Sequence, residues 1–174
     1  MRLQGATHWA DLRGPGACEV LDSAQVGELT TRLGPDPLRR DADPERAWAR
    51  IHKSGQPVAG LLMDQTVIAG IGNVFRAEVL FRARLAPYTP GKRLPREIFD
   101  AIWADLVRLL RAGVRANRIV TTAPEDRDRR GPVRIEDAHY VYRRTGLPCR
   151  ICGTPVAHAV LNGRNLFWCP KDQR

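Results

Sequence analysis

The sequence predicts a mainly α-helical fold followed by a small β module at the C-terminus. Apolar residues recur at helical spacing between residues 22 and 118, Asn162-Gly163 separates two strand-like segments, and three of the four cysteines follow residue 148. With 174 residues, 43% of them hydrophobic, the chain can bury one core or two small ones. It has no apolar run of membrane-spanning length and no secretory leader, so we expect a soluble protein without a membrane partner.

The first twenty residues carry short apolar pieces between turn-forming residues. Gly5 and the tripeptide Gly14-Pro15-Gly16 interrupt the pattern too often for a helix, and the pieces are too short for a sheet of their own. We therefore interpret residues 1–20 as the end of a preceding lobe.

Five helices are expected in the next hundred residues. The first is capped by Asp22 with Gln25, the second opens at Asp43-Pro44, and the third covers Val58 to Gln65. The fourth follows a glycine turn and stops before residue 87, and the longest runs from about residue 95 to 116. The positions expected to face inward are Val26, Leu29, Leu33, Ala47, Trp48, Ile51, Val74, Ala77, Leu80, Phe81, Ile98, Ile102, Leu106, Leu109 and Val114. Residues 21–118 are thus predicted to form one helical domain.

The pattern changes after residue 118. Residues 123–137 are mostly charged and are interrupted by proline and glycine, so we expect a loop or linker over residues 119–138. Beyond it, residues 140–142 and 154–168 favour strands, and Asn162-Gly163 is a strong signal for a two-residue hairpin turn. Residues 139–174 are therefore predicted to form the β module.

The cysteines of this module have the spacing of a metal site. Cys149 and Cys152 form one Cys-x2-Cys knuckle, and Cys169 followed by Asp172 has the same spacing across the predicted hairpin. The pattern predicts a zinc ribbon with one structural Zn²⁺, bound more weakly than by four thiolates because Asp172 replaces a cysteine. His158 is a less favoured fourth ligand, and three unligated thiols are the alternative. Cys18 stands apart, which favours a reducing, cytoplasmic location over a disulfide framework.

The charge distribution points to a polyanionic partner. The formal net charge is +9, and all of it arises after residue 54, because residues 1–54 contain equal numbers of basic and acidic side chains. Of the 28 basic residues only Lys53, Lys92 and Lys171 are lysines. The guanidinium of arginine can donate two parallel hydrogen bonds to a phosphate, which lysine cannot. A compositional bias toward arginine accounts equally well for the high ratio of arginine to lysine.

Two local motifs suit an anionic ligand. Gly70-Ile71-Gly72-Asn73 stands at a helix start, where close backbone approach, the helix dipole and the Asn73 amide favour a phosphate. The alternative is an ordinary turn with Asn73 as N-cap. Arg164 follows the hairpin turn, where a guanidinium can clamp a phosphate or can simply be a solvated surface cation.

Taken together, four segments resemble a known family. They are Leu61-Leu62-Met63-Asp64-Gln65, Gly70-Ile71-Gly72-Asn73, Ala77-Glu78-Val79-Leu80-Phe81 and Gly163-Arg164-Asn165-Leu166-Phe167-Trp168-Cys169-Pro170. Over about residues 20–174 the chain resembles the DNA-binding half of the formamidopyrimidine-DNA glycosylase and endonuclease VIII family. The resemblance implies a helix-two-turn-helix domain over 21–118 followed by a zinc ribbon, with residues 1–20 a remnant of the family's N-terminal β-sandwich lobe.

The resemblance also implies roles for individual residues. Asn73 and Arg164 would bind the DNA backbone beside a lesion, and Cys149, Cys152, Cys169 and, by position, Asp172 would be the zinc ligands. Family enzymes are bifunctional DNA glycosylase/AP lyases that use an N-terminal proline as Schiff-base nucleophile, followed by a glutamate. This chain begins Met1-Arg2-Leu3, so we expect no catalytic residue in it.

Three functions follow as hypotheses. The chain belongs to a base-excision-repair enzyme, or it is a non-catalytic DNA-binding module, or, less favoured, it is an RNA-binding helix-two-turn-helix protein. The expected partner is double-stranded DNA with damaged or abasic sites, bound by a monomer that associates with the nucleoid.

Overall fold

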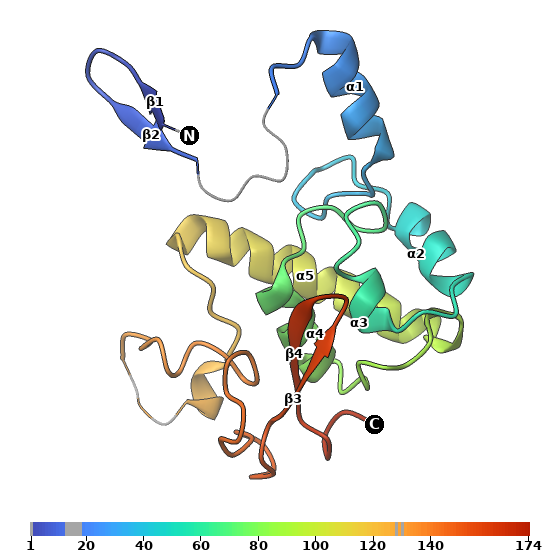
Figure 1. Ribbon diagram of the computed structural model, residues 1–174. Helices are drawn as coiled ribbons and strands as arrows, with labels where there is room; N and C mark the ends of the chain where they lie inside the picture. Colours follow the sequence, from blue (N-terminus) through green and yellow to red (C-terminus); the bar gives the residue numbers. More distant parts are fainter. Residues whose placement is uncertain (1, 13–18, 128, 130) are drawn as a thin grey trace. The chain divides into compact units, whose positions relative to one another are not determined.

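A computed structural model describes residues 2–12, 19–127, 129 and 131–174. The expectations for Gly14, Pro15, Gly16 and Cys18 lie outside these residues. The chain divides into two compact units, residues 1–32 and residues 33–174, and each is described by itself (Figure 1).

The first unit contains a hairpin and a helix. Strands β1 (Arg2–Gln4) and β2 (Trp9–Asp11) pair antiparallel, and Arg2 bonds Asp11 at 2.7 Å across them. Helix α1 (Ser23–Arg32) begins at the predicted capping box, in which the main-chain N–H of Asp22 donates to Gln25 at 2.9 Å and that of Gln25 donates to Asp22 at 2.8 Å. No residue of α1 is buried, so its apolar side chains do not add to the helical core. The boundary between the two compact units lies after residue 32. The sequence predicts a boundary after residue 20.

Among its described residues the second unit has four α-helices, and the larger of its two hydrophobic clusters is the helical core. The helices are α2 (Pro44–His52), α3 (Val58–Leu61), α4 (Asn73–Arg82) and α5 (Arg96–Ala116), with 3₁₀ turns η1 (Gly91–Arg93) and η2 (Pro124–Asp126). The largest fully buried apolar side chains of this core are Ile51, Leu62, Ile68, Leu80, Phe99, Ile102, Leu106 and Leu166. The predicted class, mainly α with a small β ribbon, is confirmed.

Local signals explain most helix ends. Asp43 caps α2 by accepting the Glu45 N–H at 3.0 Å, and Asn117 ends α5 in the left-handed region at φ 48°. Helix α3 is shorter than predicted, because Asp64 turns the chain by accepting the Thr66 N–H at 2.8 Å. The predicted inward position of Val114 is wrong: its side chain is 68% exposed, since the buried stripe of α5 ends at residue 110.

The C-terminal ribbon is a two-stranded hairpin. Strands β3 (Ala157–Leu161) and β4 (Arg164–Trp168) pair antiparallel, with Leu161 opposite Arg164. Asn162 and Gly163 both adopt positive φ, 51° and 70°, as a two-residue hairpin turn requires. The hairpin packs against α4, as Figure 1 shows, so the ribbon and the helices form one continuous body.

The expected strand at residues 140–142 does not form. The main-chain N–H groups of residues 140–142 instead donate to the buried carboxylate of Glu78 on α4. The distances are 2.8 Å from Tyr140 and 2.9 Å from both Val141 and Tyr142. The hydroxyl of Thr121 donates to the same carboxylate. A single side chain thus replaces the strand partner that the β propensity of this segment predicted.

No helix among the described residues is both long enough and apolar enough to cross a bilayer.

Candidate nucleic-acid interface and metal centre

The glycine turn before α4 is held in shape by Gln65. The side chain of Gln65 donates to the Ile71 carbonyl at 3.0 Å and accepts the Gly70 N–H at 2.8 Å, while Gly70 takes φ 82°, which glycine adopts without strain. Gly72 is the N-cap of α4 and is exposed, without a side-chain cap. The alternative of Asn73 as N-cap is therefore wrong, and the first-turn N–H groups of α4 remain available to an anion.

Asn73, at the start of α4, contacts the hairpin at the residue that follows Arg164. The Nδ2 of Asn73 donates to the carbonyl of Asn165 at 2.9 Å, which ties the first residue of α4 to the residue after Arg164. Asn73 is half-buried and Arg164 is exposed. The structure thus brings the two predicted site residues to one junction, although they are far apart in the sequence.

A buried arginine lies beneath this junction. Arg76 is 0% exposed and donates through Nη2 to the Asn165 carbonyl at 2.8 Å and to Oδ1 of Asn73. Its Nε and Nη1 find no hydrogen-bond partner among the described residues. Burial, and then the charge of nearby Arg164, lower the pKa of Arg76. Arg76 is not among the residues predicted from the sequence, where its only signal is the spacing of three residues from Asn73.

The hairpin tip is seated on the helical core. Leu166 is buried in that core, and Leu161 and Trp168 pack against it. At the tip, a Cβ added to Gly60 of α3 would lie 3.1 Å from Nδ2 of Asn162. The hairpin tip, which precedes Arg164, thus lies against α3.

Gly60→Val is expected to lower the thermal midpoint by several degrees. A Cβ at Gly60 would lie 3.1 Å from Nδ2 of Asn162, so the side chain of Asn162 or the hairpin tip must shift to admit valine, and overpacking of this kind costs about 1–3 kcal/mol, or roughly 2–12 °C in a domain of this size. Gly55→Val is the matched control, because no atom lies within 4 Å of a Cβ at Gly55. Equal midpoints for the two variants, measured by circular dichroism, would show that the tip is not seated on α3.

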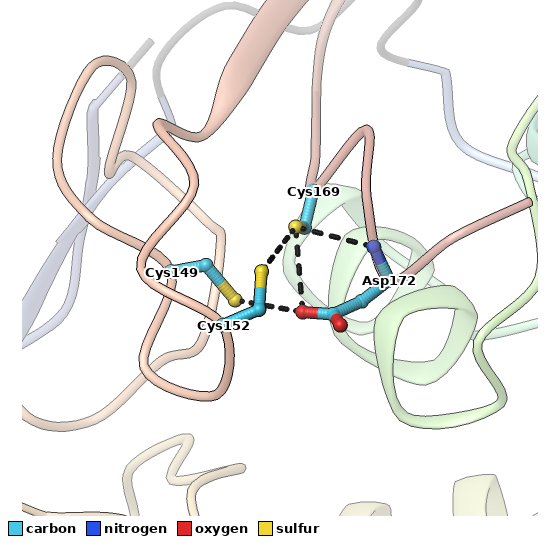
Figure 2. Close-up of side chains that lie close together, drawn as sticks. All are labelled: Cys149, Cys152, Cys169 and Asp172. Atoms are coloured by element: carbon cyan, nitrogen blue, oxygen red, sulfur yellow. Dashed lines mark hydrogen bonds between the residues drawn. The ribbon is translucent and has the colours of Figure 1, made fainter.

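Three cysteines and one aspartate form the metal centre. Their ligand atoms all lie within 4.8 Å of one another, and the four side chains converge in Figure 2. The sulfurs of Cys152 and Cys169 are 3.5 Å apart, and Oδ2 of Asp172 lies 3.1 Å from the sulfur of Cys149. Thiolates bound at about 2.3 Å to a tetrahedral zinc ion lie about 3.8 Å apart, so the set fits zinc.

Burial favours the protonated form of two of the cluster's thiols. Burial raises the pKa of the Cys149 thiol to about 12 and also raises that of Cys169. The hydrogen bond from Cys152 is the main cause that lowers the pKa of Asp172. Because zinc binds thiolates, the ion itself must drive the deprotonation of the buried thiols. His158 lies outside the cluster, exposed, with Nε2 3.1 Å from Oδ1 of Asn165.

Sequence profiles of two known domains match the chain. The formamidopyrimidine-DNA glycosylase H2TH domain matches residues 33–124, and the zinc finger found in FPG and IleRS matches residues 146–174. The fold and the metal centre therefore define a helix-two-turn-helix domain followed by a zinc finger. The chain belongs to the formamidopyrimidine-DNA glycosylase and endonuclease VIII family, and its four-residue cluster holds one structural zinc ion.

Individual relatives agree with this assignment. Endonuclease 8 1 of Mycobacterium tuberculosis is 52% identical over 175 residues, which cover 99% of this chain and 65% of the relative. The formamidopyrimidine-DNA glycosylase of Thermus thermophilus is 36% identical over 146 residues, which cover 83% of this chain and 55% of the relative. The chain thus spans somewhat less than two thirds of the length of these relatives.

Solved structures share the fold. The MutM (Fpg) protein from Thermus thermophilus superposes with a TM-score of 0.70 at 35% identity, over 87% of this chain and 57% of that one. Lactococcus lactis Fpg, solved in complex with abasic-site DNA, gives a TM-score of 0.71 at 23% identity, over 88% of this chain and 57% of that one. At that identity the second likeness concerns the fold alone.

Proposed function

We propose that this chain binds duplex DNA at damaged or abasic sites, as the DNA-binding half of a base-excision-repair protein. The observation that carries the proposal is the hydrogen bond from Asn73 to the Asn165 carbonyl, which brings the start of α4 to the residue that follows Arg164. Recognition is the role proposed, and no residue of the chain is proposed as a nucleophile.

The junction has donors to offer a phosphate. A side-chain amide has two N–H groups, and the Asn165 carbonyl takes one from Asn73, so the second is left for a ligand. Arg164, the residue before Asn165, is exposed and adds a forked guanidinium donor to this junction. The first-turn N–H groups of α4 point in the direction in which a helix attracts anions.

Buried charge strengthens the attraction without touching the ligand. Arg76 places a guanidinium below Asn73 and Asn165, where little solvent screens it. The wider surface supports the same partner, since the formal net charge of +9 arises entirely after residue 54. Contacts with the sugar-phosphate backbone do not read the base sequence. The proposal therefore implies that this chain positions the duplex rather than recognising its sequence.

A binding titration tests the proposal. We expect the zinc-loaded chain to bind a duplex that contains a tetrahydrofuran abasic analogue, with an affinity that falls as salt rises. The log–log slope should be about −0.9 for each phosphate neutralised, and more than one phosphate should be involved. Structured RNA competes at matched salt in the same experiment. Tighter binding of RNA, or binding that does not depend on salt, would contradict the proposal.

A further inference from the structure

Arg150 lies between two zinc ligands in the sequence, but its side chain forms hydrogen bonds with a segment outside the metal centre. Arg150 directly follows Cys149 and precedes Ile151 and Cys152 in the first knuckle. Its side chain is only 4% exposed. The guanidinium donates to the carbonyl of Glu136 at 2.6 Å, to the carboxylate of Asp137 at 3.2 Å and to the carbonyl of His139 at 3.2 Å. One side chain thus holds three groups of residues 136–139, named here the clasp segment.

The clasp segment is also joined to Thr121 and Thr122, which follow α5. The Thr121 N–H donates to the Ala138 carbonyl at 2.8 Å, and the Thr122 hydroxyl donates to the Asp137 carbonyl at 2.7 Å. Asp137 and Ala138 are buried. The stretch that the sequence predicts as a linker therefore ends in a segment fixed from two sides, by the residues after α5 and by the zinc knuckle.

We propose that the zinc ion has a second role, which is to hold the clasp segment in place through Arg150. A bound ion fixes Cys149 and Cys152, and the backbone between them then aims the Arg150 guanidinium at the clasp segment. The strength of a charge-assisted hydrogen bond depends on the orientation of its donor. A knuckle without metal does not hold the Arg150 guanidinium in this orientation, so the hydrogen bonds of Arg150 to the clasp segment are lost together. Arg150 thus acts as a positioning residue that couples metal occupancy to the order of residues 136–139. This coupling goes beyond DNA binding and does not depend on it.

Coupling is reciprocal, which gives a sharp test. If zinc favours the ordered clasp segment through Arg150, then the ordered clasp segment must favour zinc binding by the same factor, and loss of its contacts with Arg150 must weaken zinc binding. Asp137→Ala removes the carboxylate partner of Arg150 and leaves both knuckles intact. We expect the dissociation constant for zinc, measured by chelator competition on the full chain, to rise about tenfold in Asp137→Ala and in Arg150→Ala. The double variant should bind zinc no more weakly than Arg150→Ala alone.

Hydrogen exchange supplies the second readout. In the zinc-loaded Arg150→Ala protein, the amides of residues 136–139 should exchange about tenfold faster, while the core of α5 stays protected. Lys171→Ala is the matched control, because Lys171 also lies between two ligands but is exposed. It should change neither readout.

Three outcomes would overturn the coupling. They are an unchanged zinc affinity in Asp137→Ala, unchanged exchange of the clasp segment in zinc-loaded Arg150→Ala, and additive losses in the double variant. If Arg150→Ala loses its zinc altogether, Asp137→Ala decides the matter alone. None of these measurements contains DNA, so a failure here and a failure of DNA binding are distinguishable.

Discussion

Removal of the zinc ion is expected to lower the thermal midpoint of this chain by more than about 10 °C. The ligands close a ribbon whose own core is small, and free zinc-finger peptides gain on the order of 10 kcal/mol from the metal. Even half of that figure is large for a domain of this size, in which 1 kcal/mol shifts the midpoint by about 2–4 °C. Circular dichroism melts with and without a chelator measure the change, with elemental analysis to confirm removal.

Readdition of zinc, but not of magnesium, should restore the midpoint, because magnesium prefers oxygen ligands. Asp172→Cys should retain zinc against a stronger chelator than the natural chain does, and Asp172→Ala should lose it to a weaker one. An unchanged midpoint after complete metal removal would show that the ribbon is held by packing alone. Equal zinc retention in all three proteins would exclude Asp172 as a ligand.

Glu78→Gln is expected to destabilise the chain by about 2–5 kcal/mol, or roughly 5–15 °C in the thermal midpoint. The carboxylate is fully buried and accepts the main-chain N–H groups of residues 140–142 together with the hydroxyl of Thr121. An amide of the same shape replaces one acceptor oxygen with a donor, so at least one buried main-chain N–H is left unpaired. Chemical denaturation of the zinc-loaded protein measures the loss.

Glu97→Gln is the control for this change, because Glu97 is exposed in the first turn of α5. Its effect should stay within about 0.5 kcal/mol. If Glu78→Gln is no more harmful than Glu97→Gln, the carboxylate does not replace the missing strand at residues 140–142.

Features set by neighbours in the sequence could be predicted. The capping pair Asp22 and Gln25, the cap at Asp43 and the hairpin turn at Asn162-Gly163 all depend on contacts within a few residues. The spacing of the cysteines likewise predicts the metal centre, since each knuckle brings its own pair of ligands together.

Features that depend on distant contacts could not be predicted. The β propensity of residues 140–142 was overruled by Glu78, which is more than sixty residues away in the sequence. Arg76 has the pattern of an ordinary helical position, and only the folded hairpin shows that it is buried beneath Asn165. The role of Arg150 depends in the same way on a segment that looks like a linker.

The proposed DNA interface is tested most directly by the salt dependence of binding in two single variants. Arg164→Ala removes a charge at the junction, so its log–log slope should flatten by about 0.9 and its affinity should fall about tenfold. Asn73→Ala removes a neutral donor, so its affinity should fall at every salt concentration while the slope stays near that of the natural chain. Arg93→Ala, an exposed cation in η1, is the control and should behave like the natural chain. If both junction variants bind the abasic duplex as the control does, Asn73 and Arg164 do not hold the DNA backbone.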